Sequence, residues 1–323
     1  MGAHSSRYGR GVALILVLWF VVLLGVLAMG LSTLSRNSAL VARQLTGATK
    51  ARYLAEGGIQ MVLANLLMAQ AETKLVGDGE TFDLPFHGDN VQVTLWDESG
   101  KININAADEA LLVRLFQAID LPLGQSEELA AAIIDWRDED SLLHINGAED
   151  DDYRAAGLPY ESNDSPFLAL AELRKVLGMN KNIYRKIEPY ITIYSNNEGV
   201  NPAVASALVL LAISTDDDNR IIEDYVEQRR RNQQDGVSPP QRPNNLDDAF
   251  LIQQEEAGGG EVFTISAFAT TEYGYSAGQS MVFILTEDIG EKPIKTLDLQ
   301  PYALAVFDAD DVDEADLSES VRR

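Results

Sequence analysis

The residues with the clearest potential for chemistry form one acidic segment, residues 135–152, with the sequence DWRDEDSLLHINGAEDDD. It holds two carboxylate clusters, and Gly147 between them permits a tight turn. Asp138 and Asp140 lie two residues apart in a predicted helix-exit loop. Ca²⁺ binds about six to eight oxygen ligands at about 2.3–2.6 Å, which two acidic clusters joined by a flexible loop can supply. The segment is therefore a candidate calcium site, although its spacing is not that of an EF-hand and a solvated acidic loop is the alternative.

Motifs for catalysis are missing from this sequence. The three histidines, at positions 4, 87 and 144, are scattered, and neither H-E-x-x-H nor G-x-S-x-G occurs. The chain has no cysteine, which excludes disulfides, thiolate metal sites and cysteine nucleophiles. We therefore expect that this protein is not an enzyme.

Net charge argues against a nucleic-acid partner. The chain carries 50 acidic and 25 basic residues, for a formal charge of −25, and such a surface on average repels phosphates. Residues 100–107 and 199–203 nevertheless suggest helix-hairpin-helix elements, since in each an apolar residue and an Asn precede a helix rich in Ala and Leu. Such elements can bind DNA phosphates, but in an acidic chain we expect them to be structural.

The N-terminal residues predict a membrane-spanning segment, which would set the side of the membrane on which the rest of the chain lies. Residues 12–31 carry no charge, and at about 1.5 Å per residue such a helix crosses a hydrocarbon core of about 30 Å. Three interpretations are a cleaved secretory signal, an ordinary anchor and a type IV prepilin-like leader cut after Gly11. We favour the leader, which leaves Val12 as the first mature residue. Arg7 and Arg10 would keep the head cytoplasmic, with the rest of the chain outside.

Hydrophobic periodicity predicts one helix over residues 12–70. Its weak point is the pair Gly57-Gly58, unless these small residues let a strand approach closely. Strands are predicted at 81–86 and 91–96, joined as a hairpin, and a second β-rich pair at 261–271 and 279–285. Between them, helices are predicted at 107–119, 127–136, 168–177, 202–213, 218–234 and 245–254.

The predicted fold class is α+β, with a long N-terminal helix packed on an antiparallel sheet and a large inserted all-α domain containing the helix-hairpin-helix-like elements. The sequence leaves open whether residues 190–194 belong to the insert or to the sheet. The expected segments are a leader (1–11), a transmembrane part (12–32), the remaining helix and first strands (33–104), the insert (105–259), C-terminal strands (260–288) and a disordered acidic tail (289–323).

Six short motifs together resemble the minor pseudopilin K family of type II secretion systems, over nearly the whole length up to about residue 285. They are Arg10-Gly11-Val12-Ala13-Leu14, ARYLAEGGI at 51–59, ININA at 102–106, DWRDED at 135–140, GAEDD at 147–151 and VNPA at 200–203.

The resemblance implies a type IV pilin-like fold and a subunit at the tip of the periplasmic pseudopilus. It implies cleavage after Gly11 and N-methylation of Val12 by the prepilin peptidase. The implied location is the bacterial inner membrane, crossed once, with the C-terminal domain in the periplasm. Implied partners are minor pseudopilins I and J, the prepilin peptidase and the inner-membrane secretion platform, with no nucleic acid. The insert binds calcium in family members, which supports as ligands Asp138, Asp140, Glu149, Asp150 and Asp151.

Leu16 is informative because most type IV pilins and pseudopilins carry a glutamate at this mature position. A carboxylate within lipid is costly unless it is paired, and in ordinary subunits it pairs with the N-terminal amine of the subunit above. Protein K of the family also lacks it, so the chain fits a subunit that ends a filament. The alternatives are a minor pilin of a type IV pilus and, from another class, a membrane-anchored DNA-binding protein.

Overall fold

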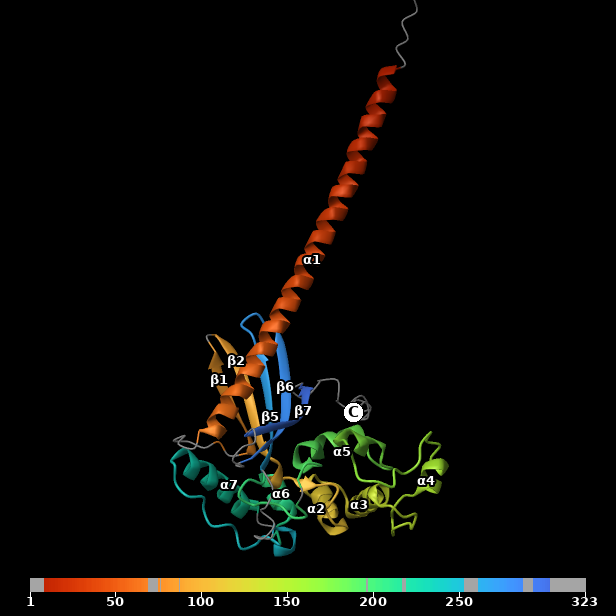
Figure 1. The fold of residues 1–323 in the computed structure, drawn as a ribbon. Coiled ribbons are helices and arrows are strands. Elements are labelled where there is room, and N and C mark those ends of the chain that lie inside the picture. The colour runs from red at the N-terminus through yellow and green to blue at the C-terminus, as the bar shows by residue number, and fades with distance from the viewer. Residues whose placement is uncertain are drawn as a thin grey trace, which may run out of the picture.

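A single helix, α1 (Gly9–Leu67), dominates the shape of the molecule. The computed structural model describes residues 9–68, 75, 77–86, 88–195, 197–216, 219–252, 261–286 and 293–302. The N-terminal half of α1 stands free of the rest of the chain, and its C-terminal half lies along a sheet (Figure 1). Since α1 runs through the glycine pair without a break, the predicted long helix is confirmed.

The sheet has five strands in the order β1-β2-β5-β6-β7, and every neighbouring pair is antiparallel. Both predicted strand pairs are therefore present, and the predicted α+β class is confirmed. The strands are β1 (Asp78–Phe86), β2 (Asp89–Asp97), β5 (Glu261–Thr270), β6 (Ser276–Leu285) and β7 (Ile294–Pro301).

Helix α1 packs on one face of the sheet through small and aliphatic side chains. Ala55, Ile59 and Val62 of α1 are buried with alternate residues of β2, such as Val91 and Val93. Successive strand residues point to opposite faces, so this alternation places one side of β2 under the helix. Gly58 lies at the contact, where an added Cβ would be 2.8 Å from Val91 Cγ1. The close approach of a strand is thus why a glycine stands here.

Strand β7 corrects the expectation of a disordered tail from residue 289. Residues 294–301 pair with the edge of β6, from Leu285↔Ile294 to Gln279↔Pro301. Ile294 also packs against the core between α1 and the sheet. The high charge of the C-terminal region suggested disorder rather than a strand. Strand β7 forms because it pairs with the edge of β6, and the sequence alone does not show that this edge is available. The acidic run 308–319 lies outside the described residues.

The chain leaves the sheet after β2 and returns at β5, and the residues between them form a helical insert with a hydrophobic core of its own. Residues 190–194 belong to this insert, because β4 pairs in parallel with β3. The elements of the insert are η1 (Glu98–Gly100), β3 (Ile102–Asn103), α2 (Glu109–Ala118), α3 (Leu123–Arg137), α4 (Asp150–Ala155), η2 (Leu170–Lys175), α5 (Lys181–Ile187), η3 (Glu188–Tyr190), β4 (Ile191–Thr192), α6 (Ala207–Ala212), α7 (Asn219–Gln234) and η4 (Asp248–Phe250).

Of the helices predicted in the insert, three correspond to α2, α3 and α7, and the one at 202–213 is shortened to α6 (Ala207–Ala212). The predicted helix at 168–177 is only the 3-10 turn η2, and that at 245–254 is only η4. In the second case Leu251 instead forms a bridge with Val200. Helices α4 and α5, with six and seven residues, were not predicted. Such short helices hold too few turns to display a clear hydrophobic period.

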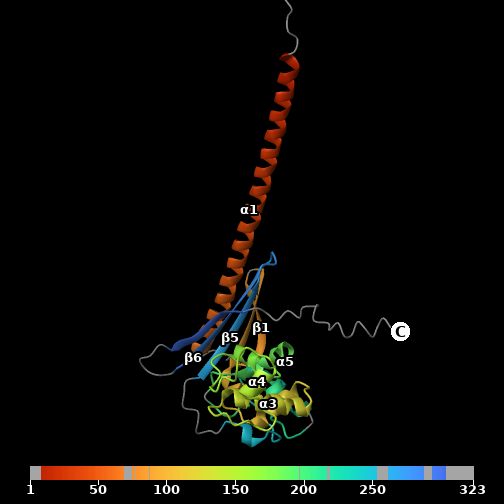
Figure 2. The ribbon, with the colours of Figure 1, turned by 90° about the vertical axis from the view of Figure 1, so that its right-hand side faces the viewer.

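A buried ion pair joins the insert to the sheet. Arg229 of α7 and Asp78 of β1 lie 2.9 Å apart, with side chains 1% and 0% exposed. Arg229 also donates to the carbonyl oxygens of Pro202 and Ala205, at 2.9 Å each. Arg230 reaches the same carboxylate at 2.8 Å from a more exposed position. These contacts fix the insert at the end of the sheet away from the free half of α1 (Figures 1 and 2).

Candidate cation site

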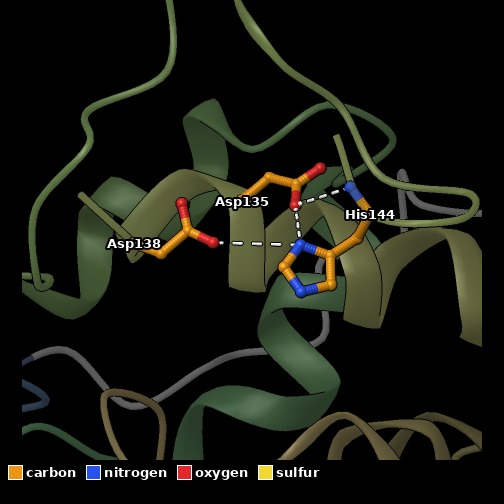
Figure 3. A group of neighbouring side chains, drawn as sticks. All are labelled: Asp135, Asp138 and His144. Carbon is orange, nitrogen blue, oxygen red and sulfur yellow. Dashed lines mark hydrogen bonds and ion pairs between the residues drawn. The ribbon is translucent and has the colours of Figure 1, made fainter. Parts of the chain in front are cut away.

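The acidic segment begins on the last turns of α3 and ends on α4. Asp135 lies on α3, and Asp138 is its C-cap residue, with its backbone N–H donating to the carbonyl oxygen of Ile134. Glu149 is the N-cap residue of α4. The loop between the two helices carries His144, whose ring turns back toward the end of α3 (Figure 3).

The first group of ligand atoms comes from Asp135, Asp138 and His144. One potential ligand atom of each lies within 4.8 Å of the others. The Nδ1 atom of His144 contacts Oδ1 of Asp135 and lies 3.8 Å from Oδ2 of Asp138 (Figure 3). The backbone N–H of His144 also donates to Oδ1 of Asp135, at 3.3 Å. Oδ2 of Asp135 and Oδ1 of Asp138 are buried and accept no hydrogen bond from any described residue.

The second group contains only oxygen ligands, from Glu149, Asp150 and Asp164, again within 4.8 Å of one another. The Ser162 hydroxyl lies between them, 2.7 Å from Oδ1 of Asp150 and 3.2 Å from Oε2 of Glu149. The other oxygen of Glu149, Oε1, is buried without a hydrogen-bond partner in the described part of the chain. Since a buried polar atom without a partner is costly, this group is incomplete as it stands.

The two groups influence each other electrostatically. Burial is the main cause that raises the pKa of Asp138, followed by the charges of Asp140 and Asp135. Burial likewise raises the pKa of Glu149, and the charges of Asp135, Asp164 and Asp138 add to it. Within the described ranges, no Lys or Arg forms an ion pair with the carboxylates of Asp135, Asp138, Glu149 or Asp164. A divalent cation would relieve this repulsion.

The structure brings together three of the five predicted ligands. Asp138 belongs to the first group, and Glu149 and Asp150 belong to the second. Asp140 instead accepts a hydrogen bond from the backbone N–H of Leu142, at 2.8 Å. Asp151 is 90% exposed and pairs with Arg154. Neither Asp140 nor Asp151 belongs to the two groups, and calcium ligation by either residue stays a prediction.

Three members of the groups were missed, namely Asp135, His144 and Asp164. Asp135 could have been found, because residues three apart on a helix lie on the same face and Asp138 follows it at that spacing. No sequence pattern marked His144 as a neighbour of these carboxylates. Asp164 lies outside the acidic segment, and only tertiary packing brings it to Glu149.

Gly147 closes the predicted tight turn, because its backbone N–H donates to the carbonyl oxygen of His144 at 2.9 Å, and it also has a second role. The left-handed residue of the loop is Asn146, with φ of 66°. A Cβ on Gly147 would lie 1.9 Å from Oδ2 of Asp135, so any side chain would collide with the buried carboxylate. A glycine is required here because the backbone passes against the candidate site.

Both helix-hairpin-helix-like stretches have structural roles. Oδ1 of Asn103 accepts a hydrogen bond from the backbone N–H of Asn105 at 2.9 Å, and Oδ1 of Asn201 does the same for Ala203 at 3.1 Å. The following helices, α2 and α6, begin behind Asp108 and Ser206, whose side chains cap them. Helices α2 and α6 then pack against each other inside the insert. The side chains of Asn103 and Asn201 therefore stabilise the local backbone before each helix.

The predicted processing site lies within α1, since both Gly11 and Val12 are helical. Residues 14–67 include a stretch long and apolar enough to cross a membrane, and none of the most apolar part is buried against the rest of the chain. This helix is a candidate membrane anchor. Cleavage after Gly11 stays a prediction.

Known proteins resemble this chain in sequence. A sequence model of the family described as "Type II secretion system (T2SS), protein K" matches residues 90–196. Type II secretion system protein K of Pectobacterium carotovorum subsp. carotovorum is 27% identical over 207 residues, which cover 56% of this chain and 62% of that protein. The protein of the same name from Klebsiella pneumoniae is 26% identical over 237 residues, covering 62% of this chain and 70% of that protein.

A solved structure resembles it in fold. The chain matches one from the crystal structure of the GspK-GspI-GspJ complex of the enterotoxigenic Escherichia coli type 2 secretion system, with a TM-score of 0.51 and 19% identity. The match covers 83% of this chain and 99% of the other. It includes the arrangement of long helix, antiparallel sheet and helical elements. This chain is thus similar in sequence to type II secretion system protein K, and it shares the fold of the solved chain.

Proposed function

We propose that this protein is a structural, non-catalytic subunit at the tip of a type II secretion pseudopilus, where it initiates or caps the filament together with minor pseudopilins I and J. Its relatives bear the name of protein K, and the similar solved chain comes from a complex of three such proteins. Through this filament the protein would act in protein export across the outer membrane.

The observation that carries the proposal is the position of the insert. It lies beyond the end of the sheet that is farthest from the free half of α1 (Figures 1 and 2). If that half of α1 is in the membrane, the insert points along the direction in which a filament grows. Another subunit stacked there would meet the insert, which the Arg229–Asp78 ion pair holds in place. Leu16 adds support, since it offers no carboxylate to the amine of a subunit above.

Membrane topology and processing are parts of the same proposal. Arg7 and Arg10 would stay in the cytoplasm, and α1 would cross the inner membrane once and carry the sheet and insert into the periplasm. The prepilin peptidase would cut after Gly11 and methylate Val12. The inner-membrane secretion platform would receive the mature subunit.

Calcium is the third part of the proposal, at the oxygen-only group of Glu149, Asp150 and Asp164. The group fits the ion because all its ligands are oxygens, the type that Ca²⁺ prefers. The unpartnered Oε1 of Glu149 leaves a ligand atom free for it. The ion would supply positive charge that holds α4 and the loop of Asp164 together.

The tip role is tested by the mature N-terminus and by assembly. Mass spectrometry of the purified protein should find methylated Val12 as the first residue, and Gly11→Val should leave the leader attached, whereas Gly9→Ala should be processed normally. Co-purification with two small pseudopilins of the same system should accompany processing. An intact N-terminus in the unaltered protein, or no association with either pseudopilin, would overturn the proposal.

Calcium binding is tested by thermal melting. A ligand that binds only the folded state at 100 times its Kd stabilises that state by about 2.7 kcal/mol, so excess calcium should raise the Tm relative to chelator. Asp164→Asn should abolish this increase, and Asp140→Asn, at a carboxylate outside the group, should keep it. Equal melting curves with calcium and chelator in the unaltered protein would contradict the site.

A further inference from the structure

One short stretch of the insert concentrates positive charge in an otherwise acidic chain. Residues 174–186 hold five basic residues and no acidic one, although the whole chain has a formal charge of −25. They lie at the end of η2 and on α5. We call these five residues the α5 basic patch: Arg174, Lys175, Lys181, Arg185 and Lys186.

The patch forms a continuous surface because η2 and α5 pack against each other. The guanidinium of Arg174 lies over the ring of Tyr184, 5.4 Å from the ring centroid, which places Arg174 beside α5. Lys181 and Arg185 lie four residues apart and therefore share one face of the helix. Positive charge thus extends from the end of η2 along α5.

Most of this positive charge has no carboxylate partner. Arg174, Lys175 and Lys181 are exposed, and none of the three forms an ion pair within the described part of the chain. Lys186 donates from Nζ to the carbonyl oxygen of Ile119, at 3.3 Å, and this acceptor carries no formal charge. A surface of one sign attracts groups of the opposite sign, so the patch suits an acidic occupant.

The chain that follows β7 starts beside this surface. Strand β7 lies against the insert, where the Tyr194 hydroxyl donates to Oδ2 of Asp298 at 3.4 Å. Burial is the main cause that raises the pKa of Tyr302, and the charge of Glu188 adds to it. Tyr302 therefore lies near Glu188, which is the C-cap residue of α5. Helix α5 is on the side of the insert that faces the sheet (Figures 1 and 2).

The sequence beyond Tyr302 carries the opposite charge. Residues 308–319 contain seven acidic residues and no basic one. Asp308 follows Tyr302 by six residues, which span at most about 20 Å, whereas the seven residues of α5 extend over only about 10 Å. Residues 303–307 carry no charge, so the chain can pass Glu188 before the acidic run begins. The acidic run can therefore reach the whole patch.

We propose that residues 308–319 bind the α5 basic patch of the same chain. The contact would tie the C-terminal edge of the sheet to the insert, at a place other than the Arg229–Asp78 ion pair. Exposed ion pairs are individually weak, but a segment on a short tether meets its site at an effective concentration in the millimolar range. This inference does not depend on the filament role or on calcium binding.

The absence of cysteine from the chain allows a cross-linking experiment on the full-length protein in detergent. Asn182→Cys, at an exposed residue of α5, is combined with Ala315→Cys in the acidic run, and disulfide formation is followed under mild oxidation. A cross-link within one chain should form at low salt and should form about tenfold more slowly at about 1 M salt, since salt screens exposed charges. Cross-links only between two chains, or a rate that does not respond to salt, would overturn the proposal.

Charge variants separate the patch from the overall charge of the molecule. Lys175→Glu with Lys181→Glu should slow the cross-link about tenfold, because two exposed attractions become repulsions. Arg43→Glu with Arg52→Glu, at exposed residues of α1, changes the net charge equally and should leave the rate unchanged. A rate unaffected by the patch variant, or slowed equally by both double variants, would refute the assignment.

A reciprocal change keeps the test decisive if the patch variant does not fold. Asp310→Lys with Asp311→Lys, made in the acidic run alone, should slow the cross-link as the patch variant does. Combining it with Lys175→Glu and Lys181→Glu should raise the rate again, because the two surfaces then carry opposite charges once more at these positions. An unchanged rate with Asp310→Lys and Asp311→Lys would contradict binding of the acidic run to the patch.

Discussion

The adjacent glycines of α1 give the sharpest test of how the helix seats on the sheet. A Cβ added to Gly57 would meet nothing within 4 Å, whereas one added to Gly58 would lie 2.8 Å from Val91 Cγ1 and 3.1 Å from Val93 Cγ2. Replacing Gly by Ala inside a helix stabilises it by about 0.8–1.0 kcal/mol, and this gain should be the same at both positions. Overpacking a core costs about 1–3 kcal/mol, and only Gly58→Ala should show this cost.

Gly57→Ala should therefore raise the free energy of unfolding by about 1 kcal/mol, while Gly58→Ala should leave it unchanged or lower it by up to about 2 kcal/mol. The helix propensity cancels in the comparison, so the difference of about 1–3 kcal/mol measures the steric contact alone. Urea unfolding in detergent, followed by the fluorescence of Trp96 on β2, measures both values. Variants that agree within about 0.5 kcal/mol would refute the packing of Gly58 against β2.

Three further perturbations test other parts of the structure. Arg229→Met should lower the free energy of unfolding by about 3–5 kcal/mol, because it breaks a buried ion pair. Arg230→Met, at a side chain 35% exposed, should lower it by about 1 kcal/mol or less. Equal losses of the two variants in urea titrations would contradict the buried ion pair between the insert and the sheet. Gly147→Ala should lower the Tm even in chelator, because its Cβ would collide with a buried carboxylate; an unchanged Tm would argue against that close approach. The hydrogen bond from Lys50 is the main cause that lowers the pKa of Asp89 below its ordinary 3.8, so this stabilisation is present at neutral pH and is lost as the pH falls through the lowered value. Lys50→Met should therefore flatten the fall in Tm between about pH 5 and about pH 3, and identical pH profiles would disprove the coupling.

Much of the fold could be predicted because its patterns are local. The periodicity of α1 and the alternation in β2 and β5 belong to long elements that bury one face. Strand β7 was missed because it depends on the free edge of β6. Asn105 shows a similar limit: it resembles a helix start, yet Asp108 caps α2, and the Asn105 side chain instead binds the backbone of Phe167 through hydrogen bonds of 2.8 and 3.0 Å.

The candidate site could be predicted only in part for the same reason. Its carboxylates in the acidic segment are visible as composition, but the partners of each are set by the path of the chain. Asp164 reaches Glu149 because the loop before Phe167 is held to the insert by Asn105 and by the stacking of Phe167 on Trp136, with ring centroids 6.3 Å apart. No local sequence pattern indicates which distant segments such tertiary contacts bring together. From the sequence alone, the acidic residues that only cap a helix or pair with Arg154 could not be distinguished from the acidic residues that face one another in the two groups.

The place of the insert between β2 and β5 also constrains how the molecule can fold. The two strands are neighbours in the centre of the sheet, and Asp97 pairs with Phe263, so the whole insert must emerge during synthesis before this pairing can form. Pairings between distant segments are slow to form. Until then the β1–β2 hairpin presents an unpaired strand edge, which is a template for aggregation. An insert with its own core can fold first and bring its two ends together, so its early folding would shorten the time for which that edge is exposed.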